Sequence, residues 1–235
     1  MSTTTFPVAP STTPQRAVTT VPAEQRIAIR GVSWDLYDRI SEAIGEKQRV
    51  FLAFDGKDLE IMTKGPNHED YRDLIGDFLK AVTTACGIRS RWLGETTWRR
   101  PKADRGLEAD QCCIFDPEKL AAANKARANL SNEIADYPDP DLAVEIDISP
   151  SLVDRPAIYA ALKVSEVWRF DGDQVVFEQL GRDGKYTAVK RSRWLPVRPE
   201  YVRRRLVEED SSDDVQWRCR LTEWAKDLAP GGNGT

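Results

Sequence analysis

The stretch AVEIDISP, residues 143–150, decides the fold, because it is an apolar strand candidate that carries two acidic side chains. Successive side chains of a strand point to opposite faces. One face holds three apolar side chains: Val144, Ile146 and Ile148. The other face holds Glu145 and Asp147. An ionised carboxylate is costly to bury alone, so we expect a cation or a hydrogen-bond network on the acidic face and a packed helix on the apolar face.

A second apolar segment with an acid at its middle is GLEADQCCIF, residues 106–115, which predicts one strand with Asp110 at mid-strand. Two or three carboxylates that converge from neighbouring strands suit Mg²⁺ or Mn²⁺, which prefer oxygen ligands. Such an ion activates a water and stabilises charge on a phosphate. Glu108 and Asp147, two residues from Asp110 and Glu145, are further candidate ligands. The alternative, that these acids pair with arginines or cap strand ends, stays open.

The rest of the chain mixes strand and helix signals and predicts a single mixed α/β domain. Helices are expected over 33–45, 68–86, 116–130, 154–163, 199–209 and 216–228. Further strands are expected at 88–92, 95–100, 166–171, 175–180 and 186–192, and as a hairpin within 49–63. We expect residues 1–26, rich in Ser, Thr, Pro and Ala, to form a disordered tail, 27–228 to form the domain, and 229–235 to be flexible.

Composition restricts the classes of function. The chain has 235 residues and a formal net charge of −4, so nucleic-acid binding would require a local basic patch. Its four cysteines show no C-x-x-C spacing and it has one histidine, which argues against a Cys/His zinc site. No stretch approaches the roughly 18 apolar residues of a membrane helix, and the N-terminus lacks the apolar segment of a signal peptide. We expect a soluble, cytoplasmic protein with no membrane partner.

One local basic stretch exists, RSRWLGETTWRRPKADR at residues 89–105, with six basic residues, two Trp and two acids. Basic residues interleaved with aromatic ones suit contacts to a nucleic-acid backbone and to single strands. The candidate nucleic-acid-binding residues are Arg89, Arg91, Arg99, Arg100 and Lys102. The alternative is that Trp92 and Trp98 belong to the core and the arginines form a solvated edge.

Three segments in this order carry a resemblance to a known family: LEIMTKGPNHEDYRDLIGDFL (59–79), GETTWRRPKADRGLEADQCCIF (94–115) and PDLAVEIDISPSLVDRPAIYAALKVSEVWRFDGD (140–173). Together they resemble the Uma-two family of restriction-endonuclease-like proteins, in the PD-(D/E)XK nuclease superfamily. The resemblance runs from about residue 27 to residue 228. It implies a mixed sheet flanked by helices, with acidic residues clustered where the strands splay apart.

The resemblance also implies roles for individual residues. Asp110 matches the Asp of the family's P-D motif, although Ala109 replaces the Pro, and Glu145 matches the acid of the E-x-K motif. Both would ligate Mg²⁺ or Mn²⁺. Asp147 stands where the motif has its lysine. Arg155, four residues before Tyr159, takes the place of the family's basic helix residue, but an arginine does not act as a base.

Further residues follow from the same resemblance. His68 matches a family histidine near the mouth of the active site, and the alternative is a polar residue that begins a helix. Glu60 is expected to approach the acids from the preceding strand. Tyr159 and Trp168 are expected to serve packing between helix and strand. Asp147 is an auxiliary metal ligand in a second-metal variant of the mechanism.

Two functions from different classes remain as hypotheses. The first is a Mg²⁺-dependent DNA endonuclease in which Asp110 and Glu145 hold the metal and Arg155 stabilises the phosphate. The second is a catalytically silent module of the same fold that lost the E-x-K lysine and binds DNA or a protein. Cutting both strands takes two active sites, so we expect a homodimer for the first.

Overall fold

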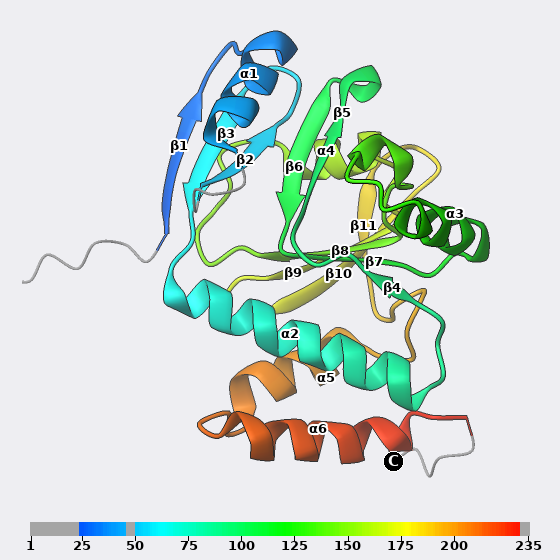
Figure 1. The fold of residues 1–235 in the computed structure, drawn as a ribbon. Helices are drawn as coiled ribbons and strands as arrows, with labels where there is room; N and C mark the ends of the chain where they lie inside the picture. The colour runs from blue at the N-terminus through cyan, green and yellow to red at the C-terminus, as the bar shows by residue number, and fades with distance from the viewer. Residues whose placement is uncertain (1–23, 46–49, 231–235) are drawn as a thin grey trace, which may run out of the picture.

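The computed structural model describes residues 24–45 and 50–230 and shows two β-sheets with helices around them (Figure 1). The predicted tail therefore lies mostly outside the described residues. However, Gln25 and Arg26, which we expected to belong to it, begin the first strand of the fold. No helix of the described ranges is long and apolar enough to cross a membrane.

The first sheet is antiparallel and has the strand order β1-β3-β2-β6-β5. Its strands are β1 (Gln25–Ile29), β2 (Phe51–Phe54), β3 (Leu59–Thr63), β5 (Thr96–Arg100) and β6 (Arg105–Ala109). Strands β2 and β3 form the predicted hairpin. Helix α1 (Trp34–Ile44) starts after Ser33, whose side chain accepts a hydrogen bond from the backbone N–H of Leu36, and ends at Gly45, as predicted. The helix packs on one face of this sheet through Tyr37.

The second sheet is mixed and has the order β11-β10-β9-β8-β7-β4. Its strands are β4 (Arg91–Trp92), β7 (Gln111–Ile114), β8 (Leu142–Ile146), β9 (Glu166–Phe170), β10 (Val175–Leu180) and β11 (Tyr186–Val189). Strands β8 and β9 pair in parallel, and the chain between them forms helix α4 (Arg155–Ala161). The other pairs in this sheet are antiparallel. The observed fold confirms the predicted mixed α/β class.

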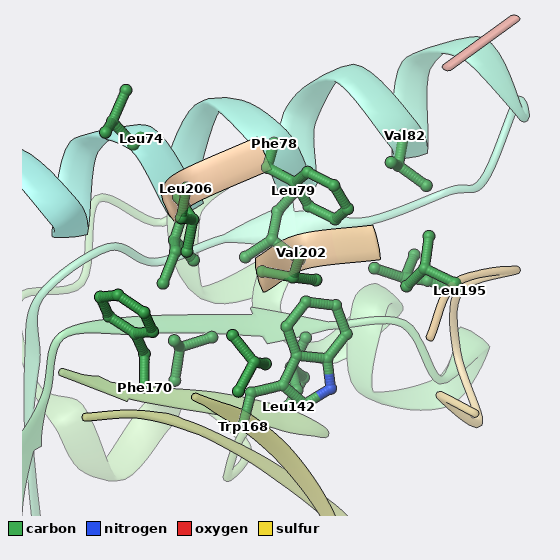
Figure 2. Close-up of a cluster of buried hydrophobic side chains, with 14 of the residues drawn as sticks. Leu74, Phe78, Leu79, Val82, Leu142, Trp168, Phe170, Leu195, Val202 and Leu206 are labelled. Carbon is green, nitrogen blue, oxygen red and sulfur yellow. The ribbon is translucent and has the colours of Figure 1, made fainter. Parts of the chain in front are cut away.

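The apolar face of β8 packs on a helix, as AVEIDISP predicted. Val144 and Ile146 lie in one buried cluster with Phe78 and Leu79 of α2 (Pro66–Ala85) and with Trp168 (Figure 2). Helix α6 (Asp214–Asp227) lies on the far side of α2 (Figure 1). Helix α5 (Pro199–Arg203) and a π-helical turn, Arg204–Glu208, precede α6 in the sequence. The acidic face of β8 thus points away from α2.

The segment EADQCCIF is not one strand, which corrects the prediction. Strand β6 ends at Ala109 and belongs to the first sheet, whereas β7 starts at Gln111 and belongs to the second. Asp110 lies at the bend between them, where its N–H donates to the Val144 carbonyl at 3.2 Å. The bend arises because β6 pairs with β2 and β5 while β7 pairs with β8.

The remaining helical segments agree with the predictions within a few residues. Asp116 begins helix α3 (Pro117–Ala128), where its side chain accepts two backbone N–H groups of the first turn. Two short 3₁₀ turns, Pro101–Ala103 and Ile134–Asp136, lie in the loops. Helix α3 turns Ala123 and Leu120 inward, so it is buried on one side.

Candidate active site at the junction of the two sheets

Asp110 occupies the point where the chain passes from one sheet to the other, and it is 2% exposed. Its Oδ2 accepts the backbone N–H of Ile146 at 2.7 Å, which fixes the carboxylate beside the residue that follows Glu145. Its Oδ1 lies 2.7 Å from Nζ of Lys64. The bend thus places Asp110 beside the acidic face of β8, where the sequence predicted the candidate site.

Glu145 is fully buried on β8, on the face opposite the α2 cluster. One carboxylate oxygen accepts a hydrogen bond from the Tyr159 hydroxyl, and the other pairs with Nη1 of Arg155. Both partners come from α4, the helix that follows β8 in the chain. The spacing of four residues between Arg155 and Tyr159 places the two groups on one side of that helix.

The cations of this region are shared between carboxylates. Arg155 pairs with Glu145 and also, at 3.2 Å, with the fully buried Glu60. Arg26 of β1 contacts three acids: Glu24, Glu60 and Asp147. Lys64 contacts Asp110 and Glu95. Three buried cations therefore serve six carboxylates, an arrangement that we call the acid cluster: Glu24, Glu60, Glu95, Asp110, Glu145 and Asp147.

The predicted auxiliary acids have different surroundings. Asp147 follows β8, has a side chain that is 15% exposed, and contacts Arg169 at 3.2 Å and Arg26 at 3.5 Å. Glu60 approaches Arg155 and Arg26, as we expected from its strand. Glu108, in contrast, accepts a hydrogen bond from the Thr97 hydroxyl at 3.1 Å on β5. It has no ion pair within the described residues, so it is not part of the acid cluster.

His68 lies in the first turn of α2 and is fully buried. Its Nε2 is 3.3 Å from Oδ2 of Asp110 and 4.0 Å from Oε1 of Glu24. Within the described ranges, neither ring nitrogen has a hydrogen-bond partner, and neither does Glu24 Oε1. The structure therefore brings His68 to Asp110, but at the bottom of the acid cluster and not at an exposed mouth.

The electrostatics follow from burial and from these shared charges. Burial, together with the nearby charges of Asp110 and Asp147, raises the pKa of Glu145 to about 7 against the opposing effect of Arg155. Burial also favours protonation of Asp110, but Lys64 and His68 outweigh it and hold the pKa of Asp110 well below its ordinary value. The two acids of the pair thus have opposite shifts. A pair of carboxylates with separated pKa values is a recurring feature of active sites.

Several residues of the acid cluster, and several that contact it, were missed or misread from the sequence. Lys64 follows a strand and precedes Gly65, a context that is typical of an exposed loop. Glu24 and Arg26 fell within the predicted tail. Tyr159 packs in the core beside Ile158, as expected, but its hydroxyl also binds Glu145. The sequence signal for one of these roles is that Lys64 lies within the family-like segment 59–79, which also contains Glu60.

The chemistry of the donor set suits a divalent cation, since Asp110 and Glu145 are carboxylates brought together from adjoining strands. Glu24 Oε1 adds a buried acceptor that has no hydrogen-bond partner among the residues the structure describes. In residues 24–45 and 50–230, however, no three acidic, His or Cys side chains are grouped as a metal site. Lys64 and Arg155 hold the carboxylates instead. Binding of Mg²⁺ or Mn²⁺ by Asp110 and Glu145 would therefore require both cationic side chains to turn away from the carboxylates.

The candidate nucleic-acid-binding residues are divided between two sheets. Arg99 pairs with Asp38 at 3.1 Å. Arg100 binds Asp139 and two backbone carbonyls and stacks near Trp98, so its guanidinium is committed to the fold. Arg91 donates to the Asn124 side chain at 2.8 Å. Arg89 and Lys102 are exposed. Trp98 is fully buried and Trp92 packs against the core, as the structural alternative predicted.

These features define a class: a mixed α/β fold of restriction-endonuclease-like architecture, with a buried acidic pair at the junction of its sheets. A family model described as "Putative restriction endonuclease", that of the Uma2 (Uma-two) family, matches residues 34–205, and the chain belongs to this family. A search of curated proteins found no match. The family membership confirms the resemblance and supports a nuclease-like function.

Proposed function

We propose that the protein is a divalent-metal-dependent DNA endonuclease whose metal is held by Asp110 and Glu145. One observation carries the proposal: the four buried carboxylates of the acid cluster, Glu24, Glu60, Asp110 and Glu145, share three buried cations. The two partly exposed members, Glu95 and Asp147, contact the same cations and also pair with Arg72 and Arg169. Buried carboxylates in excess of their cations create a negative potential that an additional cation relieves. The membership in a family of restriction-endonuclease-like proteins supports the choice of DNA as substrate.

The residues of the chain would divide the work as follows. Asp110 and Glu145 hold Mg²⁺ or Mn²⁺, and Asp147 is an auxiliary acid at the exposed edge of the cluster. When bound, such an ion supplies activation of water and stabilisation of charge on a phosphodiester. In hydrolysis the water oxygen forms the new bond to phosphorus, one ester P–O bond breaks, and the leaving oxygen takes up a proton. Arg155, released from Glu145, would stabilise the phosphate, and His68 would position Asp110.

The partners follow from the same proposal. Cleavage of both strands takes two acid clusters, which a homodimer supplies, and light scattering of the purified protein tests this. Arg89, Arg91, Arg99, Arg100 and Lys102 remain candidates for backbone contacts, with Arg89 and Lys102 the most accessible of them. A DNA substrate agrees with the cytoplasmic location that we expected from the sequence.

A second function is favoured by a specific observation. Every oxygen of Asp110 and Glu145 already has a partner inside the protein, and both side chains are shielded from solvent. Carboxylates that are fully paired inside the protein are sufficient for a catalytically silent module that binds DNA or a protein. In that case Lys64 and Arg155 neutralise the two acids permanently and no metal enters.

Plasmid nicking distinguishes the two functions. The wild type is assayed with Mg²⁺ and with Mn²⁺, beside Asp110→Asn and Glu145→Gln. The matched control is Asp141→Asn, because Asp141 is an equally buried acid at the other end of β8 and has its own lysine. The proposal predicts nicking by the wild type and the control, and a loss of at least about 100-fold in the other two variants. Absence of nicking by folded wild-type protein with both metals would favour the silent module.

A further inference from the structure

Among the three buried cations that contact the acid cluster, Lys64 is the one that pairs with Asp110. It follows the last residue of β3, and the side chain is 2% exposed. Its Nζ lies 2.7 Å from Asp110 Oδ1, also bonds to Glu95, and sits 3.4 Å from the centre of the Phe51 ring. The aromatic face and the two carboxylates together fix the position of the ammonium group.

Lys64 is held as an ammonium group by direct contacts. A lysine is positively charged at neutral pH, and Asp110 and Glu95 both contact the Lys64 Nζ. Asp147, which stands where the nuclease motif has its lysine, is an acid and cannot supply such a charge.

We propose that Lys64 supplies the ammonium group that the lysine of the E-x-K motif provides in other nucleases, since Asp147 stands at the position of that lysine. This inference rests on the proposed nuclease function. In the metal-free protein the ammonium group neutralises Asp110. During cleavage it is displaced from Asp110 and offsets negative charge on the phosphodiester.

Lys64 is better placed for this role than Arg155. The two acids that Arg155 contacts, Glu145 and Glu60, are both fully buried. Lys64 instead contacts Glu95, whose side chain is 25% exposed and also binds Arg72 at 3.1 Å. The ammonium group thus lies between the buried Asp110 and a partner at the surface.

The test compares full-length wild type, Lys64→Met and a matched control, Lys119→Met. The Lys119 Nζ lies 2.7 Å from Asp141 Oδ1, the same separation as in the Lys64–Asp110 pair. Unlike Lys64, however, Lys119 pairs with no second acid in the described part of the chain. Two quantities are measured for each protein. They are the dissociation constant for Mg²⁺ alone, by isothermal titration calorimetry, and the rate of plasmid nicking at saturating Mg²⁺.

The two quantities should move in opposite directions in Lys64→Met. Loss of the competing charge should tighten Mg²⁺ binding about tenfold. Loss of the ammonium group from the phosphodiester should slow nicking about 100-fold. Lys119→Met should match the wild type in both. A purely structural role would instead weaken Mg²⁺ binding and nicking together, since Asp110 would be displaced.

Each other outcome is decisive. Nicking by Lys64→Met at the wild-type rate, or parallel losses of binding and nicking, would overturn the inference and leave the proposed nuclease standing. A wild type that neither binds Mg²⁺ nor nicks DNA would overturn the proposed function and the role of Lys64 with it. If Lys64→Met does not fold, Lys64→Gln keeps a hydrogen-bond donor to Asp110 without the charge. The same opposite shifts are then required of that variant.

Discussion

The two ends of strand β8 carry buried acids in contrasting surroundings. At its start Asp141 accepts the backbone N–H groups of Phe115 and Asp116, both at 2.8 Å, and pairs with its own Lys119. At its end Glu145 shares Arg155 with Glu60 and lies near Asp110 and Asp147. Both acids are buried, so burial does not separate them. The two ends differ instead in the ratio of carboxylates to cations. This ratio is higher at the Glu145 end, which is therefore the candidate cation site.

The largest expected effect that sharpens this comparison is that of Arg155→Met. The substitution leaves the buried Glu145 and Glu60 without a shared cation, which should lower the free energy of unfolding by about 3–5 kcal/mol. Urea denaturation followed by circular dichroism measures the loss. In the double variant Arg155→Met/Glu145→Gln one unpaired charge is gone, so part of the stability should return. A double variant as unstable as the single one would contradict the charge-based explanation.

The pH dependence of stability should differ between the two ends as well. The pKa of Glu145 is raised from 4.5 to about 7, so the folded protein binds a proton more tightly than the unfolded chain in this window. Stability should therefore fall as pH rises from about 4.5 to 7, by on the order of 3 kcal/mol. Burial raises the pKa of Glu108 to about 7 too and adds to the trend.

Urea denaturation at a series of pH values measures this dependence. Glu145→Gln should flatten the curve partly, and Glu145→Gln/Glu108→Gln should flatten it further. Asp141→Asn should leave the slope between pH 4.5 and 7 as it is in the wild type. An equal change of slope in Asp141→Asn would remove the distinction between the two ends of β8.

The smallest effect is expected for Lys119→Met. The Lys119 side chain is 31% exposed and Asp141 keeps two backbone N–H donors, so the loss of stability should be about 1 kcal/mol. Thermal melting beside Arg155→Met provides the comparison. A cost for Lys119→Met as large as that for Arg155→Met would show that Asp141 depends on its lysine as strongly as Glu145 depends on Arg155.

Local patterns were sufficient to predict most elements of the fold. Ser33 and Asp116 predicted the starts of two helices, and the hairpin predicted within 49–63 is formed by β2 and β3. The alternation in AVEIDISP predicted both faces of β8, because a period of two is a property of the strand itself. These features depend on neighbours in the sequence, which is why one sequence reveals them.

The predictions that were wrong or incomplete concern contacts between residues that are distant in the sequence. Nothing within EADQCCIF signals a break, and the bend at Asp110 follows from pairing with strands more than 30 residues away. Lys64 contacts Asp110 across 46 positions of the chain, so its local context gave no indication of the role. The arginines at 99 and 100 looked available for DNA because the acids that bind them, Asp38 and Asp139, lie in other segments.

The measurement that tests the central claim most directly is calorimetric titration of Mn²⁺ into the wild type, Asp110→Asn and Asp141→Asn. If the acid cluster is a cation site, the wild type and Asp141→Asn should bind Mn²⁺ alike, and binding by folded Asp110→Asn should be lost. A folded wild type that binds no Mn²⁺, or binding that survives in Asp110→Asn, would show that the carboxylates at the end of β8 are as structural as Asp141.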